Sequence, residues 1–374
     1  MYTPSSDYLE NCPALQKNEI YEVRTNKDGN QFGVLGNVSK NKIFMLGASS
    51  IECLYLRPSK KIHSVLERFL LENQYDYEVN NLGASGSQSL NIINLLINKL
   101  YNKQGSTVIL TLPSNDNGPL LYKDGYFSSH RYHSTIIPAT DKRVETNTDP
   151  DLDLYKRGLG LIKAICEQLE LKLILTSICY TGDVDSLNIL NNVAREYCKE
   201  HEIDFLDLEL DFQKNPDFFY DKLHFLPKGS EFFANKIFES LKDSLDKNSE
   251  KELRVIDFGC KGLLEKQTLW SDEIIVNPTT KIKLVVDFEH LGDSKAPALY
   301  VIDYFCDPKQ TTLIKSQNPE IGYYKYFSGH QDKRIEKIFD VEIPENCTKI
   351  KIGLRPWSKE GIFVHHAFLT ILSI

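Results

Sequence analysis

The sequence predicts two successive domains, an α/β domain built on a parallel sheet and then an all-β domain. Through about the first 247 residues, short apolar runs alternate with segments whose apolar residues recur at helical spacing. Beyond residue 252, short segments of alternating apolar and polar residues follow one another, with turn residues between them and no helical pattern. At 374 residues the chain is also too long for one small core.

The first domain is expected to follow an ordered lead-in. Residues 1–40 are polar and rich in turn-forming residues, so we expect them to be a lead-in rather than a domain. The α/β domain then spans 41–247. Apolar runs predict strands over 43–46, 77–82, 107–112, 172–178 and 203–206. Helical spacing and start signals such as Asp151 and Pro227 predict helices over 62–72, 90–100, 151–169, 186–201 and 227–246.

Residues 117–150 interrupt this alternation, because no periodicity runs through them. The segment is too long for an ordinary connection, so it is either a lid or binding loop, or a surface excursion. Its aromatic, basic and imidazole side chains make it a candidate for substrate binding, through Tyr126, His130, Arg131 and His133. The spacing of the two histidines suits a metal pair, but no third ligand is near them, and we expect no metal site.

The second domain begins after a polar and charged stretch, 246–251, that has the composition of a linker. Residues 252–374 contain five clear alternating segments, over 282–288, 298–304, 338–343, 349–354 and 362–364. We expect a two-sheet sandwich. Aromatic residues in it that would suit stacking on sugars, if they are exposed, are Trp270, Tyr323, Tyr324, Tyr326 and Trp357.

Composition excludes several classes of protein. The formal net charge of −8 and the isoelectric point near 5.7 argue against a general nucleic-acid or anionic-membrane surface. No apolar run approaches 18 residues, and the first residues lack the pattern of a secretory signal. The eight cysteines show no C-x-x-C pair, which suits free thiols in a reducing compartment. We therefore expect a cytoplasmic protein without a membrane span and without a nucleic-acid partner.

Candidate reactive residues follow three of the predicted strands and precede the last helix. Ser49 follows the first strand, Gly83 the second and Asn115 the third, while Asp221 and His224 lie before the helix that Pro227 opens. Because parallel strands end at one edge of a sheet, these residues can meet in one crevice. A serine hydroxyl needs a neighbouring base to act as a nucleophile, and an imidazole held by a carboxylate supplies one. The alternative is that the serine only caps the following helix.

Four segments in this order resemble the blocks of the SGNH, or GDSL-type, serine esterase superfamily over about residues 40–245. They are Gly47-Ala48-Ser49, Asn81-Leu82-Gly83, Pro113-Ser114-Asn115-Asp116 and Asp221-Lys222-Leu223-His224. Two positions depart from the family pattern. Ala48 stands where many members have Asp, and Pro113 where the third block usually has Gly. Neither is a reacting group.

The resemblance implies a three-layer α/β/α, flavodoxin-like domain, followed here by a jelly-roll-like sandwich. It also implies a catalytic triad of Ser49, His224 and Asp221, and an oxyanion hole made by the Ser49 N–H, the Gly83 N–H and the Asn115 amide. Its members favour small acyl groups, often acetyl, on carbohydrates.

The expected activity is therefore a serine esterase that forms an acyl–Ser49 intermediate on a carbohydrate or polysaccharide substrate and needs no cofactor. One alternative is a polysaccharide O-acetyltransferase that uses acetyl-CoA, because hydrolase and transferase differ only in the acceptor of the acyl group. Another is a carbohydrate-binding protein whose site has decayed. The sequence leaves the oligomeric state open.

Overall fold

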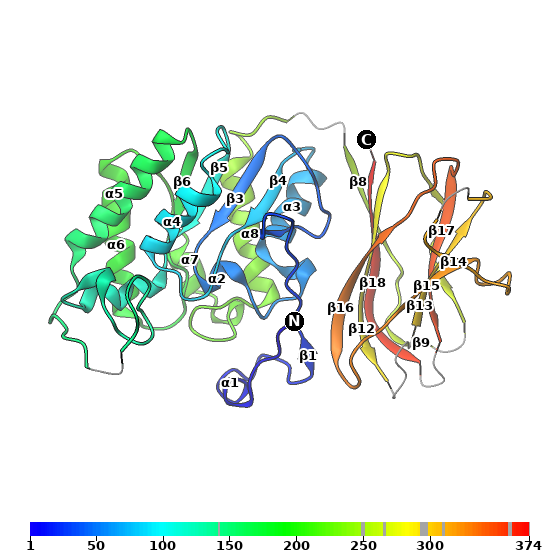
Figure 1. Ribbon diagram of the computed structural model, residues 1–374, viewed down its shortest axis with the longest axis horizontal. Coiled ribbons are helices and arrows are strands. Elements are labelled where there is room, and N and C mark those ends of the chain that lie inside the picture. The colour runs from blue at the N-terminus through cyan, green and yellow to red at the C-terminus, as the bar shows by residue number, and fades with distance from the viewer. Residues whose placement is uncertain are drawn as a thin grey trace.

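The computed structural model describes residues 1–140, 143–247, 251–264, 267–291, 298–308, 311–357 and 361–373 (Figure 1). Two domains lie side by side along its long axis. The predicted order is confirmed: an α/β domain with a mainly parallel sheet is followed by an all-β domain. Residues 248–250 of the predicted linker lie outside the described residues.

The sheet of the α/β domain has the strand order β2-β4-β3-β5-β6-β7. All neighbouring pairs are parallel except β2 with β4. The two central strands, β3 and β5, each have a run of apolar residues, 43–46 and 108–110, that is buried on both faces, which explains the apolar runs in the sequence there. The strands are β2 (Gln31–Phe32), β3 (Lys42–Leu46), β4 (Glu78–Asn81), β5 (Thr107–Thr111), β6 (Lys172–Thr176) and β7 (Asp204–Leu206).

Helices cover both faces of this sheet and form the outer two of three layers. Ile43 and Met45 of β3 pack with α3 (Ile62–Glu72) and α8 (Pro227–Leu241) on one face. Phe44 and Leu46 point to the opposite face and pack with the other long helices, α4 (Ser89–Lys99), α5 (Leu152–Gln168) and α6 (Asp185–Glu200). The shorter helices are α1 (Ser6–Asn11), α2 (Ser49–Glu52) and α7 (Glu209–Gln213), with 3₁₀ turns at Pro58–Lys60, Ser114–Asn117, Pro119–Leu121, Gly125–Phe127 and Pro216–Phe218.

Two sheets form the β domain and enclose one apolar core. The first has the order β1-β16-β12-β18-β8, with β9 also on β18, and the second the order β10-β17-β13-β15-β14, with β11 also on β17. Their strands are β1 (Glu19–Ile20), β8 (Glu252–Asp257), β9 (Gly262–Leu264), β10 (Leu269–Trp270), β11 (Ile274–Ile275), β12 (Lys281–His290), β13 (Ala298–Tyr304), β14 (Ile314–Lys315), β15 (Tyr323–Phe327), β16 (Arg334–Val341), β17 (Lys349–Pro356) and β18 (Ile362–Ser373).

The lead-in contributes a strand to each domain. β1 pairs in parallel with β16 of the sandwich, whereas β2, which begins eleven positions after β1 ends, pairs with β4 of the α/β sheet. The buried carboxylate of Glu67 on α3 then accepts hydrogen bonds from the backbone N–H groups of Leu35 (2.9 Å) and Asn37 (2.8 Å). The lead-in therefore crosses from one domain to the other and is fixed on both.

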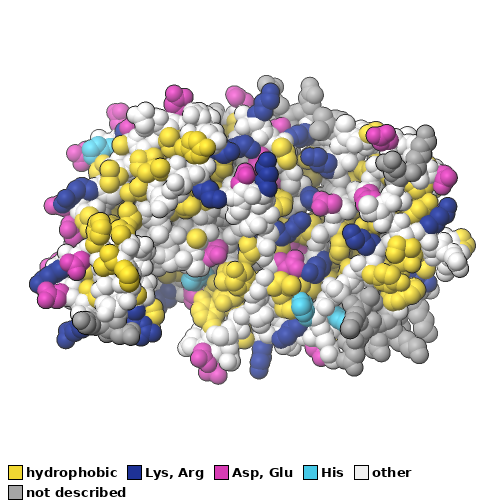
Figure 2. Space-filling model, in the orientation of Figure 1, with side chains coloured by type: hydrophobic (Ala, Val, Ile, Leu, Met, Phe, Trp, Pro, Cys, Tyr) yellow, Lys and Arg dark blue, Asp and Glu magenta, His cyan; other side chains and the backbone are white. Residues whose placement is uncertain are grey.

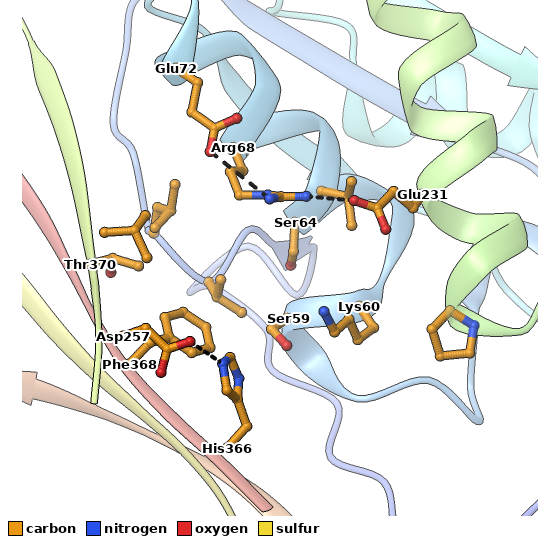
Figure 3. Close-up of a pocket in the computed structure, with 15 residues that line it drawn as sticks. Ser59, Lys60, Ser64, Arg68, Glu72, Glu231, Asp257, His366, Phe368 and Thr370 are labelled. Atoms are coloured by element: carbon orange, nitrogen blue, oxygen red, sulfur yellow. Dashed lines mark hydrogen bonds and ion pairs between the residues drawn. The ribbon is translucent and has the colours of Figure 1, made fainter. Parts of the chain in front are cut away.

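Polar contacts hold the two domains together next to this crossing. The Arg57 guanidinium lies between Glu19 and Asp287, 3.0 Å from the latter, and Asp287 also binds Arg334. Beyond these pairs a pocket of about 200 Å³ opens between α3 and α8 on one side and β8 and β18 on the other (Figure 3). The triad residues do not line it. Ser64, which does, is buried and its hydroxyl has no hydrogen-bond partner among the described residues.

A helix that crosses a membrane must be both long and apolar, so the helices can be checked for these two properties. Within the described ranges, none of the helices combines the length and the apolar character needed to cross a bilayer.

Candidate active site

The candidate nucleophile, Ser49, begins α2 immediately after β3. Gly47 makes this turn possible, because a Cβ atom there would lie 2.6 Å from Ile51 Cγ1. In Figure 1, α2 lies at the lower end of the sheet, where β3 ends, with the lead-in helix α1 below it. Figure 2 shows this lower edge indented between the insertion on one side and the N-terminal residues on the other.

Ser49, His224 and Asp221 form a continuous hydrogen-bonded chain. Ser49 Oγ lies 2.7 Å from His224 Nε2, and His224 Nδ1 lies 2.6 Å from Asp221 Oδ2. The serine and the histidine are 175 positions apart in sequence. They meet because α2 follows a central strand, while the 221–224 turn precedes α8, which packs beside the same strand. This arrangement is able to withdraw a proton from the serine hydroxyl.

The 221–224 turn holds its own carboxylate. Asp221 Oδ1 accepts hydrogen bonds from the backbone N–H groups of Leu223 and His224, both at 2.8 Å. Burial opposes ionisation of this carboxyl group, but the hydrogen bonds from the His224 side chain and from the two N–H groups outweigh it and lower its pKa to about 2. Asp221 is therefore charged at neutral pH. Tyr220 stacks on the imidazole of His224, with ring centroids 5.4 Å apart and planes 8° apart.

The three predicted oxyanion donors differ in their availability. The Ser49 N–H has no hydrogen-bond partner among the described residues, as expected for a donor kept for a ligand. Asn115 Nδ2 donates to the Ser87 carbonyl at 3.1 Å, and its second amide hydrogen finds no acceptor in the described part of the chain. The Gly83 N–H, in contrast, donates to Asn81 Oδ1 at 2.8 Å. The oxyanion role of these three groups stays a prediction. For Gly83, the N–H that would serve as the donor is already hydrogen-bonded to Asn81.

Asn81 and Glu52 connect α2 to the segment after β4. Asn81 accepts from Gly83 and donates through Nδ2 to the Ile51 carbonyl at 2.7 Å. Glu52, at the end of α2, accepts from the Ser85 N–H at 2.8 Å and from its hydroxyl. Sequence reasoning assigned neither residue a role, although Asn81 starts the second of the four quoted blocks and Glu52 lies three residues after Ser49.

The four substrate-binding candidates of the insertion have different surroundings. Tyr126 is buried and donates to the fully buried Asp116 at 2.9 Å. His133 receives or donates a hydrogen bond with the Tyr122 hydroxyl at 2.7 Å, and its imidazole stacks on that of His130 with centroids 5.0 Å apart. Arg131 is exposed and lies over the ring of its neighbour Tyr132. Substrate contact by these residues, and a lid function for 117–150, stay predictions.

The insertion is nevertheless joined to the site. Gln88, the N-cap of α4, donates to the His133 carbonyl at 2.9 Å, and the preceding carbonyl, that of Ser87, accepts from Asn115. Burial lowers the pKa of His133, and the neighbouring His130 lowers it further. In the described ranges, no group of three or more His, Cys, Asp or Glu side chains is placed to hold a metal ion.

Tyr8 is a residue of the site that sequence reasoning missed. Its hydroxyl donates to Asp221 Oδ2 at 3.0 Å, although the two residues are 213 positions apart. No local pattern marks it, because the lead-in lacks periodicity and nothing in its sequence indicates which domain it contacts.

Comparison with known proteins gives a likeness of fold. No protein-family model matches the chain, and no curated protein matches it. A GDSL-like lipase from Bacteroides thetaiotaomicron VPI-5482 is similar at 14% identity and a TM-score of 0.40, over 55% of this chain and 90% of its own. The acetyl xylan esterase AlAXEase is similar at 18% identity and a TM-score of 0.41, over 54% of this chain and 99% of its own. Esterase EstA from Pseudoalteromonas sp. is similar at 15% identity and a TM-score of 0.41, over 55% of this chain and 98% of its own.

The sheet order, the serine after the central strand β3 and the D-x-x-H turn before the last helix agree with the motif-based resemblance. The chain therefore consists of a three-layer α/β domain, whose motifs resemble those of the SGNH, or GDSL-type, hydrolases, and a separate all-β domain that follows it.

Proposed function

We propose that the protein is a serine esterase that removes small O-acyl groups, acetyl above all, from a carbohydrate through an acyl–Ser49 intermediate. The observation that carries this proposal is the hydrogen-bonded chain from Ser49 Oγ through His224 to Asp221, with distances of 2.7 and 2.6 Å. It combines a nucleophile, a base and an ionised carboxylate in the order that acyl transfer requires.

In the first half of the reaction, His224 Nε2 takes the proton of Ser49 as the hydroxyl oxygen attacks the ester carbonyl. Asp221 fixes the imidazole tautomer and stabilises the positive charge that forms on the ring. The tetrahedral intermediate collapses when His224 returns the proton to the leaving sugar oxygen. Water then repeats the sequence on the acyl–Ser49 ester and releases the acid.

Negative charge forms on the carbonyl oxygen in both halves and needs fixed donors. We assign this role to the Ser49 N–H and to the Asn115 amide hydrogen that the Ser87 carbonyl does not use. Gly83 was expected to be a third donor, but its N–H is bonded to Asn81. Its contribution in this scheme is to let the segment after β4 approach α2 closely.

The carbohydrate part of the proposal has support from the sandwich. Tyr326 and Trp357 are 39% and 52% exposed, and their rings meet edge to face with centroids 5.6 Å apart, forming an exposed aromatic surface. The three other aromatic residues that would suit stacking if exposed are half-buried and packed on apolar clusters, namely Trp270, Tyr323 and Tyr324. Of the five candidates, Tyr326 and Trp357 therefore meet the condition of exposure.

The test compares three proteins, wild type, Ser49→Ala and Ser50→Ala. The second variant is a matched control, since it removes the neighbouring hydroxyl that makes no hydrogen bond to His224. Each is incubated with 4-nitrophenyl acetate and with an acetylated xylo-oligosaccharide, a substrate chosen because one similar structure is named an acetyl xylan esterase. We expect acetate release by wild type and Ser50→Ala and none above background by Ser49→Ala.

A parallel incubation with acetyl-CoA and unmodified oligosaccharide distinguishes the alternatives. Acetyl groups that appear on sugar in a Ser49-dependent way, with little free acetate, would replace the esterase proposal by the O-acetyltransferase one. No Ser49-dependent release from any donor would leave the non-catalytic, carbohydrate-binding alternative. A cytoplasmic location stays a prediction from composition alone.

A further inference from the structure

The carboxylate of Asp221 accepts four hydrogen bonds, and one of them comes from outside its own turn. Oδ1 is taken by two backbone N–H groups, and Oδ2 is shared between His224 Nδ1 at 2.6 Å and the Tyr8 hydroxyl at 3.0 Å. We infer that Tyr8 is a positioning residue of the triad, which fixes the Asp221 oxygen that faces His224. The inference rests on the proposed function.

Packing fixes the Tyr8 ring in the position from which its hydroxyl reaches Asp221. The ring lies against Tyr55 (centroids 5.4 Å apart) and Tyr220 (6.4 Å), and Tyr220 in turn stacks on the His224 imidazole. Cys12 is buried in the same cluster. Burial, followed by the charge of Asp221 and the hydrogen bond to it, raises the pKa of Tyr8, so the residue remains a neutral phenol that can donate.

The segment that carries Tyr8 is anchored on the sandwich. Ten residues beyond Tyr8, the Asn18 carbonyl accepts from the Arg334 N–H of β16 at 2.8 Å, and β1 then pairs with β16. The Tyr2 and Tyr21 backbones also form an antiparallel bridge, which closes the lead-in on itself. One end of the segment is thus held by the β domain, while the other completes the hydrogen bonding of the triad.

Sharing Oδ2 has a chemical consequence. The phenol disperses part of the negative charge on the oxygen that binds His224, and it prevents the carboxylate from turning away from the ring. Without this donor, Oδ2 bears more of the negative charge, and His224 is the one remaining donor of those that hold this oxygen in place. Among the described residues, the titratable groups that interact with Asp221 are Tyr8, Cys12, Tyr220 and His224.

The test is Tyr8→Phe, which keeps the ring and removes only the hydroxyl. With 4-nitrophenyl acetate we expect kcat to fall about tenfold with KM within about twofold, as for loss of a hydrogen bond to a charged group. The pH profile of kcat/KM should also differ from that of wild type, because the charge on Asp221 Oδ2 is no longer shared with the phenol. Tyr55→Phe is the control, because it removes a hydroxyl from the same aromatic cluster that makes no hydrogen bond to Asp221, and its kcat and pH profile should match wild type.

A second readout does not depend on turnover. The proton between His224 Nδ1 and Asp221 should give a downfield ¹H resonance, identified by its loss in His224→Gln, and this resonance should shift in Tyr8→Phe but not in Tyr55→Phe. An unchanged resonance in Tyr8→Phe, with wild-type kcat and pH profile wherever the ester is hydrolysed, would overturn the inference. If wild type hydrolyses no ester, the proposed function fails, and the resonance alone decides the role of Tyr8.

Discussion

Substitution of Gly83 by alanine tests how closely the segment after β4 must approach the nucleophile helix. A methyl group at this position would lie 2.6 Å from the Glu52 nitrogen and 2.8 Å from the Ile51 carbonyl carbon, both backbone atoms of α2. Ordinary van der Waals contact begins near 3.4 Å, so one of the two segments must move by about 0.8 Å. Neither moves freely, because Asn81 donates to the Ile51 carbonyl at 2.7 Å.

The displaced helix carries Ser49 at its start, and the serine must stay within hydrogen-bond reach of His224. Because misplacement of a reacting group by about 1 Å can cost about a hundredfold, we expect kcat/KM for 4-nitrophenyl acetate to fall about 100-fold in Gly83→Ala. Alanine keeps the backbone N–H, so this loss would not come from removing a donor.

The matched control is Gly158→Ala on α5, where the new methyl would lie 3.7 Å from the nearest atom, Ser89 Cβ. A glycine-to-alanine change in a helix should stabilise the protein by about 0.5–1 kcal/mol and leave kcat/KM unchanged. If Gly83→Ala unfolded near the wild-type temperature and had kcat/KM within about threefold of wild type, close approach of the two segments would not be what positions Ser49.

The other predictions concern the donors and the buried acids around the site. Asn115→Ala should lower kcat about 100-fold or more with the fold intact. Asn117→Ala is the control, because its amide donates instead to Ser186 at 3.0 Å, and its kcat should not fall. Equal kcat values for the two variants would remove Asn115 from the oxyanion hole. Burial raises the pKa of Asp116 from 3.8 to about 6 despite its hydrogen bonds with Ser89 and Tyr126. The folded state therefore holds this proton more tightly than the unfolded state, so the stabilising contribution is complete below pH 3.8 and is lost as pH rises to about 6. Relative to Asp116→Asn, the free energy of unfolding of wild type, measured by urea titration, should fall by up to about 3 kcal/mol between pH 4 and 7; parallel pH curves for the two proteins would contradict it.

The elements that the sequence predicts well are those whose own residues carry the signal. β3 and β5 have apolar runs at their centres that are buried on both faces, α5 begins directly after the expected N-cap Asp151, and α8 begins at the expected Pro227. The Asp151 side chain caps α5 by accepting from the Leu154 N–H at 2.8 Å. The end of α8 was placed about five residues too late, because polar residues after Leu241 fit a helix as well as a turn. Helix ends without a specific cap are weakly encoded.

Elements that depend on distant partners could not be predicted. β1 and β2 have two residues each, too few for any periodicity, and β1 pairs with a strand more than 300 positions away. The same holds within the site. The Ser, His and Asp residues could be found because their types and order are informative, whereas the partner of the Gly83 N–H depends on the Asn81 rotamer. Tyr8 lies in a segment without a motif, and only the folded chain brings it to Asp221.

The path of the lead-in has a consequence for the modularity of this chain. Because the lead-in contributes β1 to the sandwich and β2 to the α/β sheet, neither domain can be separated without losing part of a sheet. Truncation at residue 41 or at residue 247 would leave an unpaired strand edge on one or both of the resulting fragments. Thermal denaturation of the whole chain should accordingly give one cooperative transition, and recombination of the sandwich with other catalytic domains would have to carry the first forty residues along.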